Sequence, residues 1–237
     1  RRTRGPGRGK GGEDMMMRRG VNGKLKMVKG TILSLFVFAA AGISSSVWSA
    51  DASLVRISGE VQVRARGKTA FQKAYAGFPL SFGDLVQTQK AALAQVLFPD
   101  GNAILIKENT TLRMGGKPGK VQINIPAGEF LIGLKQKLAR GKSLTVKTPA
   151  AVAAVRGTLF WGLSDAELNT TYACFQSAIE ITAGGKSVTL KQGEKTFIPY
   201  GKPAQKIEPA NVPLDYLDTF AGDGSIEGFK EMLQSGE

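Results

Sequence analysis

Alternating apolar and polar residues are the strongest signal in this chain, and they predict β-strands. A period of two is clear at residues 60–64 and 121–125, as expected for strands with one buried face. Short apolar or β-branched runs continue the pattern at 91–98, 103–106, 130–132, 144–146, 158–163, 178–182, 188–190 and 196–198. Turn signals separate the runs, namely Gly83-Asp84, Pro99-Asp100-Gly101, Gly115-Gly116, Pro126-Ala127-Gly128, Gly184-Gly185 and Gln192-Gly193. The pattern predicts an all-β fold.

The arrangement of these strands can be narrowed from the same pattern. Asp100 and Gly101 between two apolar runs predict a hairpin. The run at 91–98 is expected to be a strand, whereas 134–140 is expected to be a loop or a short helix. No strict internal period is present, so a regular repeat array is not supported. We expect many short strands forming a β-sandwich or a solenoid-like domain over residues 53–200.

The C-terminal part, residues 201–237, has a different pattern. Residues 213–220 and 225–233 are expected to form two short amphipathic helices, with Ile226, Phe229 and Leu233 on one face. The stretch 211–237 holds six acidic residues and one lysine. We expect a linker followed by a helical cap on the β domain. An acidic partner-binding tail is the alternative.

The first fifty residues read as a leader. Residues 1–14 are basic and glycine-rich, and are expected to be an untranslated or disordered leader upstream of a start at Met15, Met16, Met17 or Met27. Residues 15–52 form a tripartite export signal, with a basic segment, an apolar segment at 32–43 and a small-residue segment. Cleavage is expected near Ser49, Ala50 or Ala52. The alternative is a retained inner-membrane anchor at 31–50.

Composition excludes much catalytic chemistry. The chain has no histidine and one cysteine, Cys174, so His-based nucleophile pairs, His-ligated zinc, internal disulfides and iron–sulfur clusters are ruled out. No cofactor, metal site or catalytic residue is predicted. The formal charge is +13, but residues 1–50 contribute +8 of it, so the rest gives no nucleic-acid signature. A glycan hydrolase using Asp84 and Asp100 stays a distant alternative, because both lie in turn signals.

Three blocks of this chain resemble the FecR domain, the periplasmic part of ferric-citrate-type regulators. The first runs from Gly59-Glu60-Val61 to Gly83-Asp84-Leu85-Val86-Gln87-Thr88, and the second is the strand–hairpin–strand around Asp100-Gly101. The third and most specific is Thr148-Pro149 followed by Val155-Arg156-Gly157-Thr158-Leu159-Phe160. A last match lies at Ala183-Gly184-Gly185, Val188-Thr189-Leu190 and Gly193-Glu194. The resemblance spans residues 58–199 and implies a periplasmic interaction domain rather than an enzyme.

The motif residues are expected to be structural. They are Gly83, Asp84, Thr88, Asp100, Gly101, Thr148, Pro149, Arg156, Gly157, Thr158 and Phe160. Glycines permit tight turns, and Asp84 and Asp100 can accept hydrogen bonds from turn amides. Arg156 is expected to be half-buried in a strand, clamped by backbone carbonyls or by a carboxylate such as Asp100 or Glu129. A ligand-binding Arg156 is the alternative.

In the FecR family, the domain receives a signal from an outer-membrane receptor, and a cytoplasmic segment passes it to a sigma factor. Few residues precede the apolar segment of this chain, so a stand-alone exported version is expected. The resemblance implies an envelope protein or ligand as partner, with an outer-membrane receptor as one candidate. Contact with the membrane is expected only if the N-terminal helix is retained, as in a membrane-anchored FecR-like regulator.

One basic cluster could contact such a partner. It comprises Lys135, Lys137, Arg140, Lys142 and Lys147. A solvated loop or sheet edge is the simpler interpretation, and an anionic partner patch is the functional one. Cys174 lies in a strand-like stretch and is expected to be a buried thiol, with an intermolecular disulfide as the alternative. The sequence thus predicts a non-enzymatic periplasmic binding or sensing module.

Overall fold

The computed structural model describes residues 50–204 and 208–209, all within the compact unit Val47–Glu237. The leader at 1–14, most of the export signal at 15–52 and the expected C-terminal helices lie outside these residues. Every regular element that is described is a β-strand, which confirms the all-β prediction. No described residue belongs to a helix that could cross a membrane.

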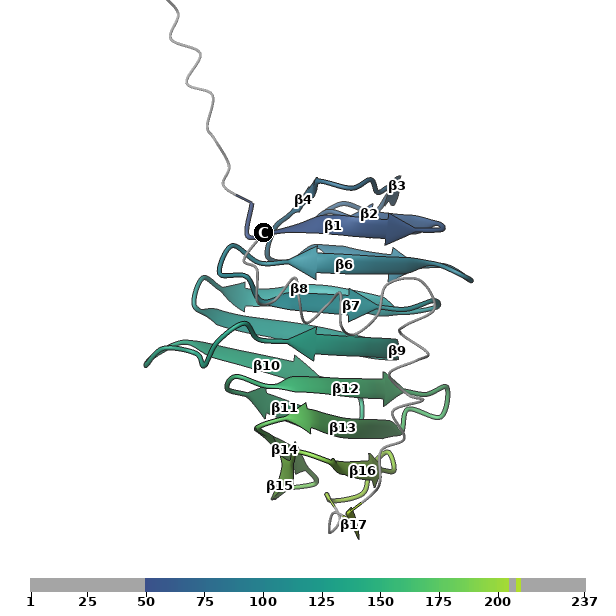
Figure 1. Ribbon diagram of the computed structural model, residues 1–237. Helices are drawn as coiled ribbons and strands as arrows, with labels where there is room; N and C mark the ends of the chain where they lie inside the picture. The colour runs from purple at the N-terminus through teal and green to yellow at the C-terminus, as the bar shows by residue number, and fades with distance from the viewer. Residues whose placement is uncertain (1–49, 205–207, 210–237) are drawn as a thin grey trace, which may run out of the picture. The chain divides into compact units, whose positions relative to one another are not determined.

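The strands form two layers, here called layer A and layer B. In order of pairing, layer A contains β4 (Phe78–Leu80), β1 (Ala52–Ser58), β6 (Leu93–Leu97), β7 (Ala103–Ile106), β9 (Lys120–Gly133), β12 (Leu159–Ser164), β13 (Thr170–Gln176), β16 (Glu194–Ile198) and β17 (Glu208–Pro209). Figure 1 shows β1, β6, β7, β9, β12 and β13 following one another in this layer.

Layer B contains the remaining strands and also part of β9. In order of pairing they are β3 (Gln72–Lys73), β2 (Val61–Arg64), β5 (Leu85–Thr88), β8 (Thr111–Lys117), β9, β10 (Ser143–Lys147), β11 (Val152–Val155), β14 (Ala178–Ala183) and β15 (Lys186–Lys191). The chain passes from one layer to the other after each strand or hairpin, as a solenoid-like sandwich requires. Among the described pairings, only β9 with β10 is parallel.

The strand β9 joins the two layers into one connected sheet. Its first half pairs with β8 and β10 in layer B, and its second half pairs with β7 and β12 in layer A. The residues Pro126-Ala127-Gly128, predicted to be a turn, lie inside β9 where the strand changes layer. Gly115 and Gly116, also predicted to be a turn, lie inside β8. Both turn predictions are wrong.

The hydrophobic core lies between the layers. It takes inward residues from both, such as Ile104, Phe130 and Phe160 from layer A and Val63 and Ile123 from layer B. At its centre, the ring of Phe130 contacts the rings of Phe160 and Tyr172, with centroids 6.3 and 6.4 Å apart. Both contacts are edge-on, a geometry that aromatic pairs prefer. These rings fix the position of β9 against β12 and β13.

The expected hairpin is confirmed between β6 and β7. Gly101 adopts a φ of +80°, and its amide donates to the Phe98 carbonyl. The Asp100 carboxylate accepts a hydrogen bond of 3.2 Å from the Asn102 amide. Residues 134–142 form an irregular segment between β9 and β10. For 134–140 a loop or a short helix was expected, and the structure has the loop.

Candidate functional site

A cleft of about 510 Å³ opens on the outer face of layer B, and it is the best candidate for a binding site. Its floor is one row of residues in register across four strands, Thr145, Ala154, Glu180 and Thr189. Because side chains alternate across a strand, this row points away from the core. The small side chain of Ala154 leaves the hollow between its larger neighbours.

Three cations line this cleft. Arg140 and Lys142 come from the loop between β9 and β10, and Arg156 follows the last residue of β11. All three side chains are exposed. With Glu180 as the one acidic residue among the lining side chains, the cleft carries a net positive charge. It is suited to an anionic group that also donates a hydrogen bond to a carboxylate or hydroxyl.

The loop that carries two of these cations is held by the Val-Arg-Gly-Thr segment. The amide of Leu134 donates to the Thr158 carbonyl at 3.1 Å. Gly157 has a φ of +106°, and a Cβ at this position would lie 2.8 Å from the Cα of Lys137. Only glycine allows this close approach of the two backbones. The segment therefore positions the rim of the cleft.

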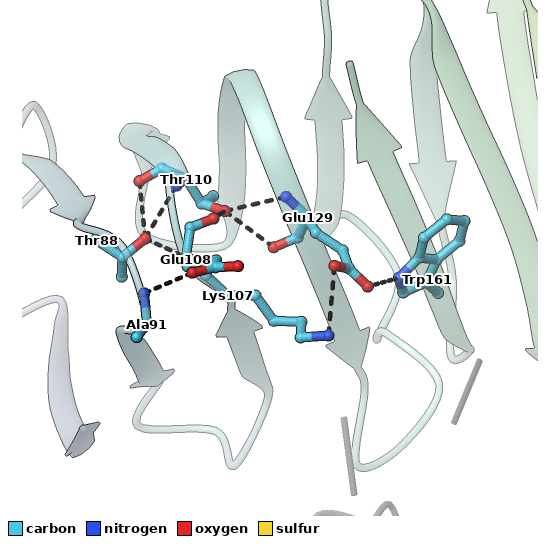
Figure 2. A network of polar contacts seen from close by, with 7 residues as sticks. All are labelled: Thr88, Ala91, Lys107, Glu108, Thr110, Glu129 and Trp161. Carbon is cyan, nitrogen blue, oxygen red and sulfur yellow. Dashed lines mark hydrogen bonds and ion pairs between the residues drawn. The ribbon is translucent and has the colours of Figure 1, made fainter. Parts of the chain in front are cut away.

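The structure contradicts the predicted clamp at Arg156. β11 ends at Val155, and Arg156 lies in the bend that follows, with its side chain exposed. The carboxylates considered as its partners are occupied elsewhere. The Asp100 carboxylate accepts from the Asn102 amide. Figure 2 shows that Glu129 accepts from Trp161 Nε1 at 2.8 Å and pairs with Lys107 Nζ at 3.4 Å. The prediction failed because it extended the strand through Gly157.

Other motif residues have structural positions. The buried Asp84 accepts hydrogen bonds from the amides of Arg66 and Ser81 at 2.8 and 2.9 Å, next to Gly83 with a φ of +107°. Thr88 Oγ1 accepts from the Thr110 amide at 3.0 Å and donates to the Lys107 carbonyl. Figure 2 shows this threonine pair beside the Glu129 network. These contacts close turns between strands of the two layers.

The third block has one satisfied and one unsatisfied threonine. Thr148 Oγ1 accepts from the Thr170 hydroxyl at 2.8 Å and from the Ala151 amide at 3.3 Å, closing the turn that contains Pro149. Thr158 is 1% exposed, and its hydroxyl has no hydrogen-bond partner among the described residues. Phe160 lies in the core and is fully buried.

The structure divides the predicted basic cluster. All five side chains are exposed, but Lys135, Lys137 and Lys147 do not line the cleft. The amide of Lys135 donates to Asn102 Oδ1 at 3.1 Å, which places that lysine at the β6–β7 hairpin. Sequence proximity grouped residues that the loop and β10 separate.

The floor of the cleft was missed by sequence reasoning. Thr145, Glu180 and Thr189 occupy the polar positions of alternating strands, so their outward orientation could have been inferred. Their common row could not, because it depends on the register of four strands. No group of three or more Cys, Asp or Glu residues that could hold a metal ion occurs in the described part of the chain.

The buried Cys174 and Tyr172 side chains both stay protonated at neutral pH. Cys174 is buried, and burial raises the pKa of its thiol from 9.0 to about 11, so it is protonated at neutral pH. Burial also raises the pKa of Tyr172 well above its ordinary value, partly opposed by its hydrogen bond with Thr148. The buried position of Cys174 agrees with the sequence prediction.

Comparisons with known proteins agree with this architecture. The family model described as "FecR protein" matches residues 84–180, a range that contains both the Asp-Gly hairpin and the Val-Arg-Gly-Thr segment. A search of curated proteins gave no match.

Among solved structures, one neighbour is a crystal structure at 1.65 Å of a proposed anti-sigma factor from Parabacteroides distasonis ATCC 8503. Its TM-score is 0.50 at 14% identity, over 57% of this chain and 64% of that one. A second structure of a proposed anti-sigma factor from the same organism, at 2.50 Å, has a TM-score of 0.47 at 15% identity, over 54% of this chain and 60% of that one. This chain thus spans less than two thirds of these neighbours. The match places a FecR domain at residues 84–180, within the all-β fold.

Proposed function

We propose that this protein is an exported, non-enzymatic sensing module of the cell envelope, whose basic cleft binds an acidic segment of a partner protein. The FecR domain supports a regulatory or sensing role. The observation that carries the finer proposal is the exposed Arg156 beside Arg140 and Lys142 in a preformed cleft. Among residues 50–204 and 208–209, the side chain of Arg156 has no hydrogen-bond or ion-pair partner, so this arginine of the family's most specific segment is available to pair with a carboxylate.

The chemistry of the cleft favours a peptide over a small inorganic anion. Glu180 lies in the floor and repels a compact anion, whereas the flanking hydroxyls of Thr145 and Thr189 can bind main-chain groups. The floor is continuous across β10, β11, β14 and β15, so an extended acidic segment can lie along the row. The three cations would then pair with its side chains.

A direct test uses a fluorescein-labelled hexaglutamate peptide and fluorescence anisotropy with the purified protein. An exposed charge pair contributes up to about 1 kcal/mol, so Arg156→Gln should weaken binding by up to about fivefold. Arg113→Gln is the matched control, because Arg113 is an exposed arginine on the outer face of layer B that does not line the cleft. Equal losses in both variants would mean that binding reflects total charge and would refute the cleft as the site.

The export proposal rests on the leader, and the contacts at the start of β1 favour cleavage before Asp51 over cleavage after Ala52. The Asp51 amide donates to the Leu80 carbonyl at 2.9 Å, and its carboxylate accepts from the Phe82 amide at 2.8 Å. Ala52 is 3% exposed. Cleavage after Ala52 would remove these contacts, so we propose cleavage after Ser49 or Ala50. N-terminal sequencing of protein from a periplasmic fraction tests this. An intact N-terminus in the membrane fraction would instead support the anchored alternative.

A further inference from the structure

The outer face of layer A carries a second apolar cluster. It consists of Ala103, Leu105, Leu131, Leu159, Trp161 and Ala173, with Leu93, Leu97, Leu163 and Phe175 at its border. Along each strand these residues alternate with members of the main core, such as Ile104 and Phe130. They therefore lie on the side of layer A that points away from layer B.

This outer apolar face is buried. Leu105 and Trp161 are each 3% exposed, and Leu131 is fully buried. Its polar members are satisfied as well, since Arg56, Gln95, Lys107 and Trp161 each have an interaction partner. No strand that the structure describes lies over this face, because every described strand of layer A pairs only edge to edge within the sheet. Its burial therefore calls for a cover other than these strands.

We infer that the chain's own residues 211–237 occupy this face. The segment leaves the sheet in the right place, because β17 is the edge strand of layer A and ends at Pro209. Six strand spacings separate β17 from β6, which is about 29 Å at about 4.8 Å each. The remaining 28 residues would reach about 42 Å even if all of them were helical, at about 1.5 Å per residue, and the non-helical parts around the two expected helices extend this reach. The length is therefore sufficient to cross the face.

Pattern and charge match this occupant. Ile226, Phe229 and Leu233 fall on one side of a helix, which gives an apolar stripe for the leucine-rich face. The segment 211–237 has a net charge of −5, and the outer face of layer A presents the cations Arg56 and Lys195 in addition to Lys107, which pairs with Glu129. Phe197 on β16 is 53% exposed, so the buried part of the outer face reaches from β6 to β13 and does not include this side chain.

The inference goes beyond the proposed function, since it concerns the opposite layer and does not depend on export or on the basic cleft. It assigns the outer face of layer A as a docking surface for an acidic amphipathic segment. An external protein that uses this face has to displace residues 211–237. The C-terminal segment is then an internal competitor for any such partner.

Trp161 allows a direct test in the full chain. Replacing Trp48 with phenylalanine leaves Trp161 as the one tryptophan of the protein. In this background, Phe229→Asp and Leu233→Asp should raise the acrylamide quenching constant of Trp161 several-fold and shift its emission to the red. Gln234→Asp is the matched control, because it introduces the same charge next to Leu233 but off the apolar stripe, and it should change neither signal. Far-UV circular dichroism verifies that each variant keeps its β-structure.

The outcomes of this experiment distinguish residues 211–237 from the other segments or molecules that could cover the outer face of layer A. Unchanged shielding of Trp161 in both stripe variants would overturn the inference. So would exposure of Trp161 in a chain that starts at Asp51, which would assign the cover to the leader. Quenching that increases on dilution would assign the cover to a second copy of the chain and would also overturn it. If a protease site replaces residues 205–207, the released segment should stay bound in gel filtration and be exchanged by a synthetic peptide of residues 211–237.

Discussion

Replacing Gly162 with alanine should destabilise the protein by forcing an aromatic ring out of the core. Gly162 lies in β12, directly opposite Phe130 in β9. A Cβ at this position would lie 2.3 Å from the Phe130 Cζ, with two more ring atoms within 2.9 Å. Contacts this short cannot exist, so the ring or the strand has to move. Phe130 is itself fully buried between Phe160 and Tyr172, which leaves the ring no free space.

The expected magnitude follows from two opposing effects. Overpacking a well-packed core costs about 1–3 kcal/mol. Alanine also restricts the unfolded chain more than glycine, which offsets about 0.5–1 kcal/mol. We therefore expect a net loss of about 1–2 kcal/mol in the free energy of unfolding, which lowers the Tm by roughly 2–8 °C for a domain of this size. Urea unfolding followed by circular dichroism measures the first quantity, and a thermal scan measures the second.

Two further variants make the result specific to the ring. Gly115→Ala is the matched control, because Gly115 is also a strand glycine and its nearest neighbour would be 3.3 Å from the new Cβ. It should change stability much less. Phe130→Leu removes the ring, so the loss of unfolding free energy caused by Gly162→Ala should be smaller in the double variant than in the single one. Residues in contact show such a coupling. A Gly162→Ala protein as stable as the parent would refute the register between β9 and β12.

Three other predictions concern stability. Thr158→Val should leave the free energy of unfolding unchanged or raise it by about 1 kcal/mol, because it removes a buried hydroxyl without a partner among the described residues; a clear loss in urea unfolding would reveal a bond to that hydroxyl. Asp84→Ala should cost about 2–4 kcal/mol in the same assay, because two backbone amides lose their acceptor, and an unchanged midpoint would contradict this. The thiol of Cys174 has a higher pKa in the folded protein, about 11, than its ordinary value of 9.0, so above pH 9.0 the unfolded chain loses this proton more readily. The free energy of unfolding should therefore be unaffected below pH 9.0 and fall between pH 9.0 and about 11, by up to about 1.4 kcal/mol per pH unit. In Cys174→Ser the fall should begin at a higher pH, where Tyr172 begins to titrate.

Features set by local chemistry were predictable from the sequence. The Asp100-Gly101 hairpin and the Gly83-Asp84 turn were found because each depends on a positive φ and a carboxylate close to a backbone amide. Strand positions were found because one face of each strand is buried. The all-β class needed nothing more than these two kinds of local signal.

Glycines inside strands misled the same reasoning. Gly128 was read as part of a turn, but it lies in β9, where a Cβ would overlap Thr110. Gly116 lies in β8, where a Cβ would overlap the Lys120 carbonyl. In both cases glycine permits a close approach between neighbouring strands rather than a reversal of the chain. That approach is a property of the assembled sheet, so no local pattern could have distinguished it from a turn.

The four residues of the Val-Arg-Gly-Thr segment differ in how far they are buried, and this difference indicates which of them can contact a partner. Val155 and Thr158 are buried, at 5% and 1% exposure, and Gly157 is needed for the close approach of the Lys137 backbone. Three of the four positions are thus committed to the fold and to holding the loop before β10. Arg156 alone reaches the surface, and it does so at the rim of the cleft that this loop completes. A substitution at Val155, Gly157 or Thr158 would alter a binding surface only by moving its support, whereas a substitution at Arg156 would alter the surface itself. Stability and affinity should therefore separate within one segment, with Arg156→Gln affecting affinity alone.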